Sequence, residues 1–468
     1  MRTLLCGGPL EINLIFWRNE MLKRTMIMGL AVVALIAAFP VWSQNKANVK
    51  GMDITIGNWW ADYDVNTKKP LNDAAEKTLE QRKQLMKEYN VTIREKAITD
   101  WNGMQQKAVI STMSGKPEAQ VFMMQPNWAM AMRARGLLAP IPNTIKSPKP
   151  IGKGYLPVEF NQPTIDSFTF DGKAYAFSVG INLNNFQALF FNKRLFREAG
   201  LDPNLPYDMQ KAGTWTWAEF LTICKKLTRD TNNDGKMDTY AMCADLSTEM
   251  LDAILSSNGA QYVDKDPKTG KFVNATGRPE FLEALQYAIR LKTEGVLKPR
   301  PENSNWDWYK SEFIDGKVAM RIDESYIANS DSVELNKMKD DWGMVLFPKG
   351  PKSSTYRVFS RDNLMVIPAT YKPAEVEKIL WAVSLWYTPA DDDWKSGQYN
   401  YFRDSRAVNE TLALVRNPKL SMIKYFSYIN GLERGDIAWE MWHHDGEPAQ
   451  LIERVSQDWN AKIAETNR

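Results

Sequence analysis

Two neighbouring runs decide the fold of this chain: FQALFFNKRLFREAGLD at residues 186–202 and TWTWAEFLTICKKLTRDTNNDGKMDTYAM at residues 214–242. The first run begins as an apolar strand over residues 186–191 and turns at Asn192 into a short basic helix. Gly200 can end that helix, because glycine adopts a left-handed backbone without steric cost. The first run therefore predicts a strand, a helix and a turn in close succession.

The second run predicts a longer helix that begins at Thr216. The Thr216 hydroxyl can cap the free amides while Glu219, three residues on, returns the bond in a capping box. Behind the cap one helical face is apolar; it consists of Trp217, Phe220, Leu221, Cys224 and Leu227. An acidic loop at residues 230–238 follows, and a new strand is expected from Thr239.

Together the two runs resemble the characteristic segment of carbohydrate-binding extracellular solute-binding proteins, the maltose-binding-protein-like family that serves ABC importers. Typical members carry a Tyr-Asn-Lys-x-Leu-Phe-x-x-Ala-Gly-Leu run and then a Thr-Trp-x-Glu-Phe helix. Residues 191–201 read FNKRLFREAGL, and residues 216–220 read TWAEF. The resemblance implies an α/β fold of the type II periplasmic-binding-protein class, in which two lobes, each a mixed sheet flanked by helices, are joined by hinge crossovers.

Length and composition agree with a two-lobed globular protein. A chain of 468 residues exceeds what one hydrophobic core usually supports. Hydrophobic residues make up 44% and charged residues 25%, which is ordinary for globular proteins. The net charge of +3 is too small to indicate nucleic acid or an anionic membrane as a partner.

The N-terminal region predicts export. Two basic residues precede an uncharged apolar run, residues 26–42, that ends before the small residue Ser43. This is the pattern of a signal peptide cleaved after Ser43, with Met21 as the expected start. A retained membrane anchor is the alternative, but the run is shorter than the ~20 residues of a spanning helix and Pro40 interrupts its end. No cysteine stands at the cut, so we expect a periplasmic protein that is not lipid-anchored.

Strands and helices alternate through the rest of the chain, which predicts parallel or mixed sheets covered by helices. Residues 313–322 (FIDGKVAMRI) resemble the family's Phe-x-x-Gly-Lys-x-Ala-Met run. We expect hinge crossovers near residues 178–185 and 343–351. The predicted division is a leader and signal peptide at 1–43, a first lobe at 44–180 and 347–395, and a second lobe at 181–346 and 396–468.

Evidence for catalysis is thin. The two histidines, His443 and His444, are adjacent and have no nucleophile motif beside them, and the glycine-rich phosphate signatures are absent. Carboxylates are abundant, but the sequence does not bring two into register for glycoside hydrolysis. We therefore expect no enzyme activity and no required cofactor.

The acidic loop is the one candidate metal site. Oxygen-bearing side chains at Asp230, Asn232, Asp234 and Asp238, with Lys236 between them, match the first part of a calcium loop. Position 12 of the loop is Ala241, where an EF-hand places a bidentate Glu. The sequence is compatible with two interpretations of this loop, a structural calcium site and a metal-free turn. Cys224 and Cys243 likewise either pair in an oxidising compartment or pack as free thiols.

Tryptophan is the strongest compositional clue, with 17 in the chain. Indole rings can stack on the C–H faces of sugar rings while polar side chains bind the hydroxyls, although core packing is the commoner role for any one Trp. Trp217, Trp381 and Trp386 lie on apolar helix faces and are expected in the core. The family's ligand positions, matched motif by motif, imply that the solute contacts Trp59, Trp60, Asp62, Gln125, Asn127, Trp128, Asn185, Glu249, Asp323, Tyr326, Trp439 and Trp442.

The resemblance implies a periplasmic protein that captures a sugar, expected to be an oligosaccharide, and delivers it to ABC permease subunits. We expect it to be a monomer. One alternative is the same fold with another solute, such as a polyol phosphate, a uronate or a peptide. An exported carbohydrate-active enzyme is a second alternative, and a chemoreceptor partner is a third.

Overall fold

The computed structural model describes residues 49–70, 72–146, 156–180, 186–243, 248–305, 307–328, 335–360, 363–443 and 446–468. The predicted signal peptide at 1–43 and the predicted site residue Asn185 lie outside these ranges. Among the described residues, no helix is both long and apolar enough to cross a lipid bilayer.

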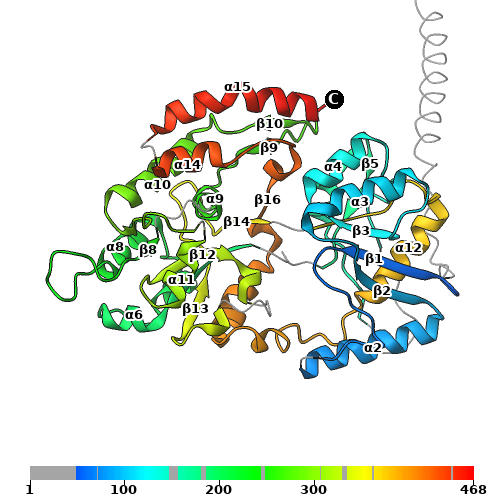
Figure 1. Cartoon of the computed structure of the whole chain (residues 1–468), viewed down its shortest axis with the longest axis horizontal. Helices are drawn as coiled ribbons and strands as arrows, with labels where there is room; N and C mark the ends of the chain where they lie inside the picture. Colours follow the sequence, from blue (N-terminus) through cyan, green and yellow to red (C-terminus); the bar gives the residue numbers. More distant parts are fainter. Residues whose placement is uncertain are drawn as a thin grey trace, which may run out of the picture. The chain divides into compact units, whose positions relative to one another are not determined.

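The first lobe is built on a five-stranded sheet with the order β2-β1-β3-β15-β6 (Figure 1). β1, β2 and β3 are parallel, whereas β15 runs antiparallel to both of its neighbours. Its elements are β1 (Asp53–Asn58), α2 (Asp73–Tyr89), β2 (Thr92–Ala97), α3 (Trp101–Met113), β3 (Val121–Met124), α4 (Pro126–Ala134), α5 (Gln162–Ser167), β4 (Thr169–Phe170), β5 (Lys173–Ala174), β6 (Ala176–Phe177), β15 (Leu364–Val366) and α12 (Pro373–Trp386).

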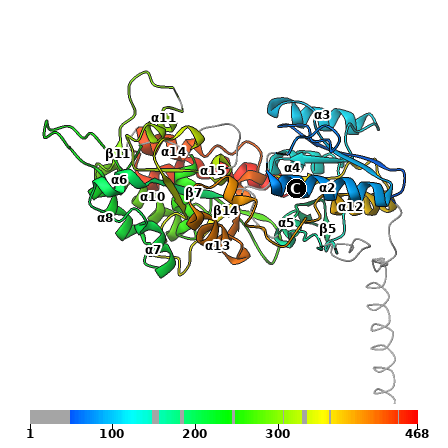
Figure 2. The same cartoon turned by 90° about the horizontal axis from the view of Figure 1, so that it is seen from below.

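The strand order explains where the helices lie. The connection from β1 to β2 and the connection from β2 to β3 run in opposite directions along the sheet. Since crossovers between parallel strands are almost always right-handed, this order predicts that α2 and α3 cover opposite faces. Figures 1 and 2 show α3 on one side of this sheet and α2 with α12 on the other.

The second lobe is built on the three-stranded antiparallel sheet β12-β7-β13, with short parallel pairs β8/β11 and β14/β16 beside it. Its main elements are β7 (Gln187–Asn192), α6 (Lys193–Glu198), α7 (Leu205–Ala212), α8 (Trp217–Leu227), β8 (Met242–Cys243), α9 (Thr248–Ser257), β9 (Val263–Lys265), β10 (Phe272–Asn274), α10 (Pro279–Thr293), β11 (Leu297–Lys298), α11 (Trp308–Ile314), β12 (Met320–Glu324), η1 (Ser325–Ala328), β13 (Trp342–Val345), β14 (Val358–Ser360), η4 (Ala407–Leu412), β16 (Ser421–Ile423), η6 (Tyr425–Tyr428), α14 (Gly435–His443) and α15 (Pro448–Thr466). The predicted crossover at 343–351 is therefore misplaced, because the chain stays in the second lobe through β14, where the amide of Gly350 donates to the carbonyl of Ser257 and Tyr356 donates to the carbonyl of Gln210.

The central strand β7 comes from the run that opens the sequence analysis. All six of its residues are buried, with no alternation between the two faces. Continuous burial is expected of a strand that helices cover on both faces. At its end Asn192 caps α6, since the Asn192 side chain accepts hydrogen bonds from the amides of Arg194 and Leu195. Gly200 then turns the chain with φ +72°.

The predicted capping box of α8 is wrong. Thr216 is the N-cap residue, but its side chain makes no capping hydrogen bond. The amide of Trp217 instead donates to the carbonyl of Lys349 at 3.0 Å. A backbone segment distant in sequence thus supplies an acceptor for the helix start.

The predicted core tryptophans are confirmed, with Trp217, Trp381 and Trp386 only 5%, 4% and 1% exposed. Cys224 and Cys243 are both buried. Burial in apolar surroundings raises the pKa of Cys224 well above its ordinary value. A thiol with a raised pKa is a poor nucleophile, and both cysteines act as small core residues here.

Candidate functional site

A tryptophan follows each of the three parallel strands of the first sheet. Trp59 and Trp60 come directly after β1, Trp101 opens α3 after β2, and Trp128 lies in the first turn of α4 after β3. The carboxyl ends of parallel strands meet at one edge of a sheet, which is where open α/β sheets bind ligands. The topology therefore brings the four rings together.

The four rings form a tryptophan cluster that is centred on Trp59. The Trp59 ring lies 4.9 Å from Trp60, 5.1 Å from Trp101 and 5.5 Å from Trp128, all in edge-to-face contact. Trp101 and Trp128 are 4.8 Å apart. Trp128 is only 9% exposed, whereas Trp60 is 49% and Trp101 41% exposed. Trp128 is thus the buried member of the cluster, whereas the rings of Trp60 and Trp101 are accessible to solvent.

The turn that places Trp59 and Trp60 is held by a buried asparagine. Asn58 is fully buried at the end of β1. Its Oδ1 accepts hydrogen bonds from the amides of Trp60 and Ala61, and its Nδ2 donates to the carbonyl of Ala61. An Asx-type turn of this kind fixes the backbone locally. The backbone that carries the Trp59 and Trp60 side chains is therefore held in place by Asn58.

Two of the three polar residues predicted beside the tryptophans, Asp62 and Gln125, have structural partners. Oδ1 of Asp62 accepts from the Ala97 amide at 2.8 Å, which ties the loop after β1 to the end of β2. Gln125 is buried, and its Nε2 donates to Oδ1 of Asn363 at 2.6 Å. The side chain of Asn127 is half-buried in the first turn of α4.

In the second lobe the predicted residues Asp323 and Tyr326 lie at the end of β12 and in η1. Asp323 is buried, and Nε of Arg321 donates to its Oδ2 at 3.0 Å. Burial raises the pKa of Asp323, and the charge of Arg321 opposes part of that rise. Tyr326 is 46% exposed, so its ring is accessible from solvent.

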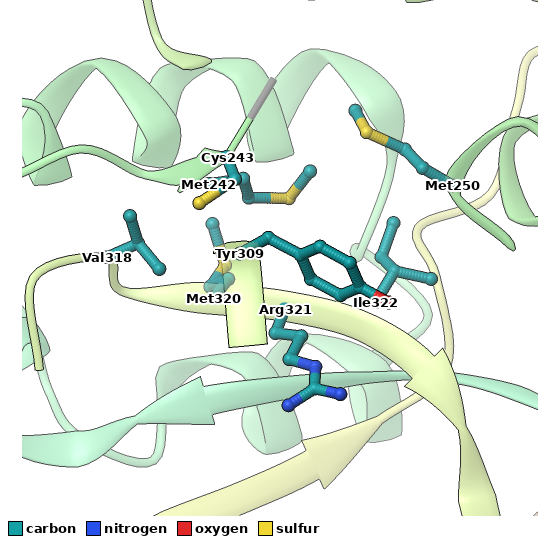
Figure 3. A pocket seen from close by; sticks show the side chains of 8 residues that line it. All are labelled: Met242, Cys243, Met250, Tyr309, Val318, Met320, Arg321 and Ile322. Atoms are coloured by element: carbon teal, nitrogen blue, oxygen red, sulfur yellow. The ribbon is translucent and has the colours of Figure 1, made fainter. Parts of the chain in front are cut away.

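Arg321 also lines a small pocket beside β12 (Figure 3). It is lined by Met242, Cys243, Met250, Tyr309, Val318, Met320, Arg321 and Ile322. The guanidinium carbon of Arg321 lies 5.3 Å from the centre of the Tyr309 ring. Most of the lining side chains are apolar or carry sulfur, and such a wall suits a hydroxyl-rich solute poorly. We therefore do not place the solute in this pocket.

A buried charge cluster in the second lobe has no counterpart in the sequence predictions. Asp252 on α9 is fully buried, and its Oδ2 accepts hydrogen bonds from Lys424 and Arg434. These three residues come from α9, from the residue after β16 and from the residue before α14. The charge of Glu249, a predicted ligand residue, acts on both Arg434 and Asp323. No sequence signal pointed to the cluster, since its members are up to 182 residues apart.

The two predicted C-terminal tryptophans have different environments. Trp442 is 5% exposed and belongs to the hydrophobic core, whereas Trp439 is 46% exposed. Trp439 lines a surface groove between α14 and α15 with Asp436, Glu440 and Arg454. The structure places neither ring in the tryptophan cluster.

The acidic loop at 230–238 uses its carboxylates to close its own turns. Asp230 accepts from the amide of Gly235 at 2.8 Å, and Asp234 accepts from the amide of Lys236 at 2.8 Å. Asp238 accepts from the hydroxyl and the amide of Thr231, and these bonds lower the pKa of Asp238. In the part of the chain that the structure describes, no group of three or more His, Cys, Asp or Glu side chains could hold a metal ion.

Comparison with solved structures establishes the fold. The cyclic α-maltosyl-1,6-maltose binding protein from Arthrobacter globiformis matches with a TM-score of 0.59 at 16% identity, covering 88% of this chain and 98% of that chain. An ABC substrate-binding protein from Listeria monocytogenes, in complex with cycloalternan, matches with a TM-score of 0.56 at 16% identity, covering 88% and 99%. UgpB from Mycobacterium tuberculosis, in complex with glycerophosphocholine, matches with a TM-score of 0.59 at 14% identity, covering 88% and 99%. The predicted two-lobed periplasmic-binding-protein fold is confirmed.

The sequence comparisons point to a family rather than to an individual protein. No curated protein matches this sequence. A family model described as bacterial extracellular solute-binding protein matches residues 80–380, which is more than half of the chain. As the runs at 186–202 and 214–242 predict, this chain belongs to the bacterial extracellular solute-binding protein family.

Proposed function

We propose that this protein captures an oligosaccharide outside the cytoplasmic membrane and delivers it to an ABC importer, without catalysing a reaction. The tryptophan cluster carries the proposal. Trp60 and Trp101 flank Trp59 and are both exposed, so the first lobe presents more than one indole surface. Sugar rings offer C–H faces to such surfaces, and two exposed indoles suit a solute of two or more rings.

Two of the matched solved structures add support, because their names describe carbohydrate ligands. UgpB is named with glycerophosphocholine, so the shared fold also accommodates a phosphodiester. Three cations of the second lobe already have carboxylate partners: Lys424 and Arg434 both bind Asp252, and Arg321 binds Asp323. An anionic solute would have to compete with these carboxylates.

The experiment is a thermal-shift screen of the purified protein against neutral oligosaccharides, uronates, glycerophosphodiesters and peptides. A solute that binds only the folded state raises the melting temperature. We expect neutral oligosaccharides to raise it and monosaccharides to do so less. A response to glycerophosphodiesters or peptides alone would overturn the proposed solute class.

Trp101→Ala and Met113→Ala form a matched pair for this screen, because both side chains are exposed at opposite ends of α3. We expect Trp101→Ala to weaken oligosaccharide binding by about 1–3 kcal/mol, on the scale of an aromatic anchor. Met113→Ala should bind as the parent does. If calorimetry gives equal oligosaccharide affinities for the two variants, Trp101 does not contact the solute.

Localisation is part of the same proposal. The family is described as extracellular, and we propose that residues 1–43 are removed on export to the periplasm. Mass spectrometry of protein from the periplasmic fraction should give a chain that begins near Gln44. A chain that keeps residues 26–42 and sediments with membranes would contradict it.

A further inference from the structure

A lysine of the second lobe binds the carboxyl end of a helix in the first lobe. Lys265, the last residue of β9, donates from Nζ to the carbonyls of Asp166, Ser167 and Thr169 at 3.4, 3.0 and 3.2 Å. These carbonyls belong to the last turn of α5 and the residues that follow it. A cation is favoured at this end of a helix, because its carbonyls have no partners within the helix.

Aromatic rings surround this contact. Nζ of Lys265 lies 4.7 Å from the centre of the Phe170 ring, and Phe170 lies 6.1 Å from Phe272 of β10. On the first lobe, the guanidinium carbon of Arg133 lies 3.9 Å from the centre of the Phe170 ring. Burial lowers the pKa of Lys265, and the charge of Arg133 lowers it further. The three carbonyls therefore compensate a partly desolvated cation.

A second contact joins the end of α5 to the second lobe. The hydroxyls of Ser167 and Tyr428 are 2.7 Å apart and buried, and the Tyr428 ring lies 5.6 Å from Phe168. Tyr428 ends η6, which follows β16 in the second lobe. The end of α5 thus receives a lysine from β9 and a tyrosine from η6.

We propose that Lys265 and Tyr428 form an interlobe clasp that fixes the arrangement of the two lobes before solute binds. They are positioning residues: neither takes part in the ring contacts of the tryptophan cluster. A clasp that holds one arrangement shifts the equilibrium between arrangements, and this shift changes the apparent affinity for any solute that binds only one of them. The clasp therefore acts on solute binding through lobe geometry.

Spin-label distances in the solute-free protein test the clasp directly. Labels at Met113→Cys on α3 and Gln286→Cys on α10 report on the two lobes, and Cys224 and Cys243 are buried and should not react. Cys6 is replaced by serine. We expect one narrow distance distribution in the parent and a broadened or shifted distribution in Lys265→Met, which keeps an apolar stem beside Phe170 but loses the donor. Tyr428→Phe should give a smaller change of the same kind.

Lys462→Met is the matched control. Nζ of Lys462 donates to the carbonyl of Gly431 at 2.6 Å, which is a lysine-to-carbonyl contact within the second lobe alone. Its distance distribution should equal that of the parent. An unchanged distribution in both Lys265→Met and Tyr428→Phe would overturn the clasp, and so would a lower melting temperature without a change in distance. The measurement needs no solute, so its result is independent of whether the solute is a sugar.

Discussion

Gly343 shows how closely one residue is constrained in the second lobe. It pairs with Phe191 across β13 and β7. A Cβ atom at Gly343 would lie 2.2 Å from Cζ of Phe191, whose side chain is fully buried. Gly343→Ala must therefore displace the ring or the strand, and we expect it to lower the free energy of unfolding by about 1–3 kcal/mol. Urea denaturation measures the loss.

Gly277→Ala is the control for that measurement. A Cβ at Gly277 has no heavy atom within 4 Å. Replacing glycine at a compatible position restricts the unfolded chain, so stability should stay the same or rise by up to about 1 kcal/mol. Equal losses at both positions would show that the close approach to Phe191 is not the cause.

Trp60 and Trp128 should separate binding from stability at the same site. Trp128 is buried beneath Trp59 and Trp101, so Trp128→Ala should cost about 3–5 kcal/mol of stability as well as affinity. Trp60 is about half exposed, and Trp60→Ala should lose affinity with little change in melting temperature. Calorimetry and thermal denaturation check the pair. A large loss of stability in Trp60→Ala with unchanged affinity would mean that this ring is structural.

At the scale of single elements, Asp340 joins the start of α6 to the segment that leads into β13. Its carboxylate accepts from Nε of Arg194 at 3.0 Å and from Nδ2 of Asn192 at 2.8 Å. Partial burial opposes ionisation, but the hydrogen bonds from Arg194 and Asn192 outweigh it and lower the pKa of Asp340. A carboxyl whose pKa is lower in the folded state stabilises the fold above its unfolded pKa of about 3.9 and loses that contribution as pH falls through the folded value.

Asp340→Asn therefore has a pH-dependent effect. The variant should be less stable than the parent at pH 7, and the difference should shrink as pH falls below about 4, because the parent then loses the same charge. Urea denaturation across this range measures it. A difference that is constant with pH would assign the effect to packing rather than to the carboxylate.

Whether the loop at 230–238 binds calcium can be tested by measuring the melting temperature with and without the ion. The carboxylates of Asp230, Asp234 and Asp238 already accept hydrogen bonds from the loop itself. We therefore expect equal melting temperatures with a chelator and with excess calcium. A melting temperature that rises with calcium in the parent but not in Asp234→Ala would show that the loop binds calcium.

Element boundaries could be predicted where the signal is local. Apolar spacing and end residues predict helices over residues 73–89, 101–113 and 279–293, and α2, α3 and α10 have these bounds. The cap of α8 could not be predicted in this way, because its acceptor is the carbonyl of Lys349, more than a hundred residues away. Local rules describe a helix end well only when the partners are local.

At the scale of the whole molecule, some residues of the candidate site could be predicted from sequence motifs, whereas others are brought together only by the tertiary fold. The family's ligand positions predicted Trp59, Trp60 and Trp128, and these residues follow β1 and β3 at the edge of the sheet where the parallel strands end. Trp101 is not among the family's ligand positions, and only the strand order places it against Trp59. Asp252, Lys424 and Arg434 meet through tertiary packing alone, which leaves no pattern in the sequence.

The last prediction concerns movement of the two lobes. A solute can shift their arrangement only if it binds one arrangement better than another, so it must contact both lobes. We expect an oligosaccharide to do so through the tryptophan cluster of the first lobe and through Tyr326 and its neighbours in the second. Tryptophan emission and the radius of gyration should then change together, with the same dependence on solute concentration. If emission changes while the radius of gyration does not, the solute binds the first lobe alone, and the second lobe takes no part in capture.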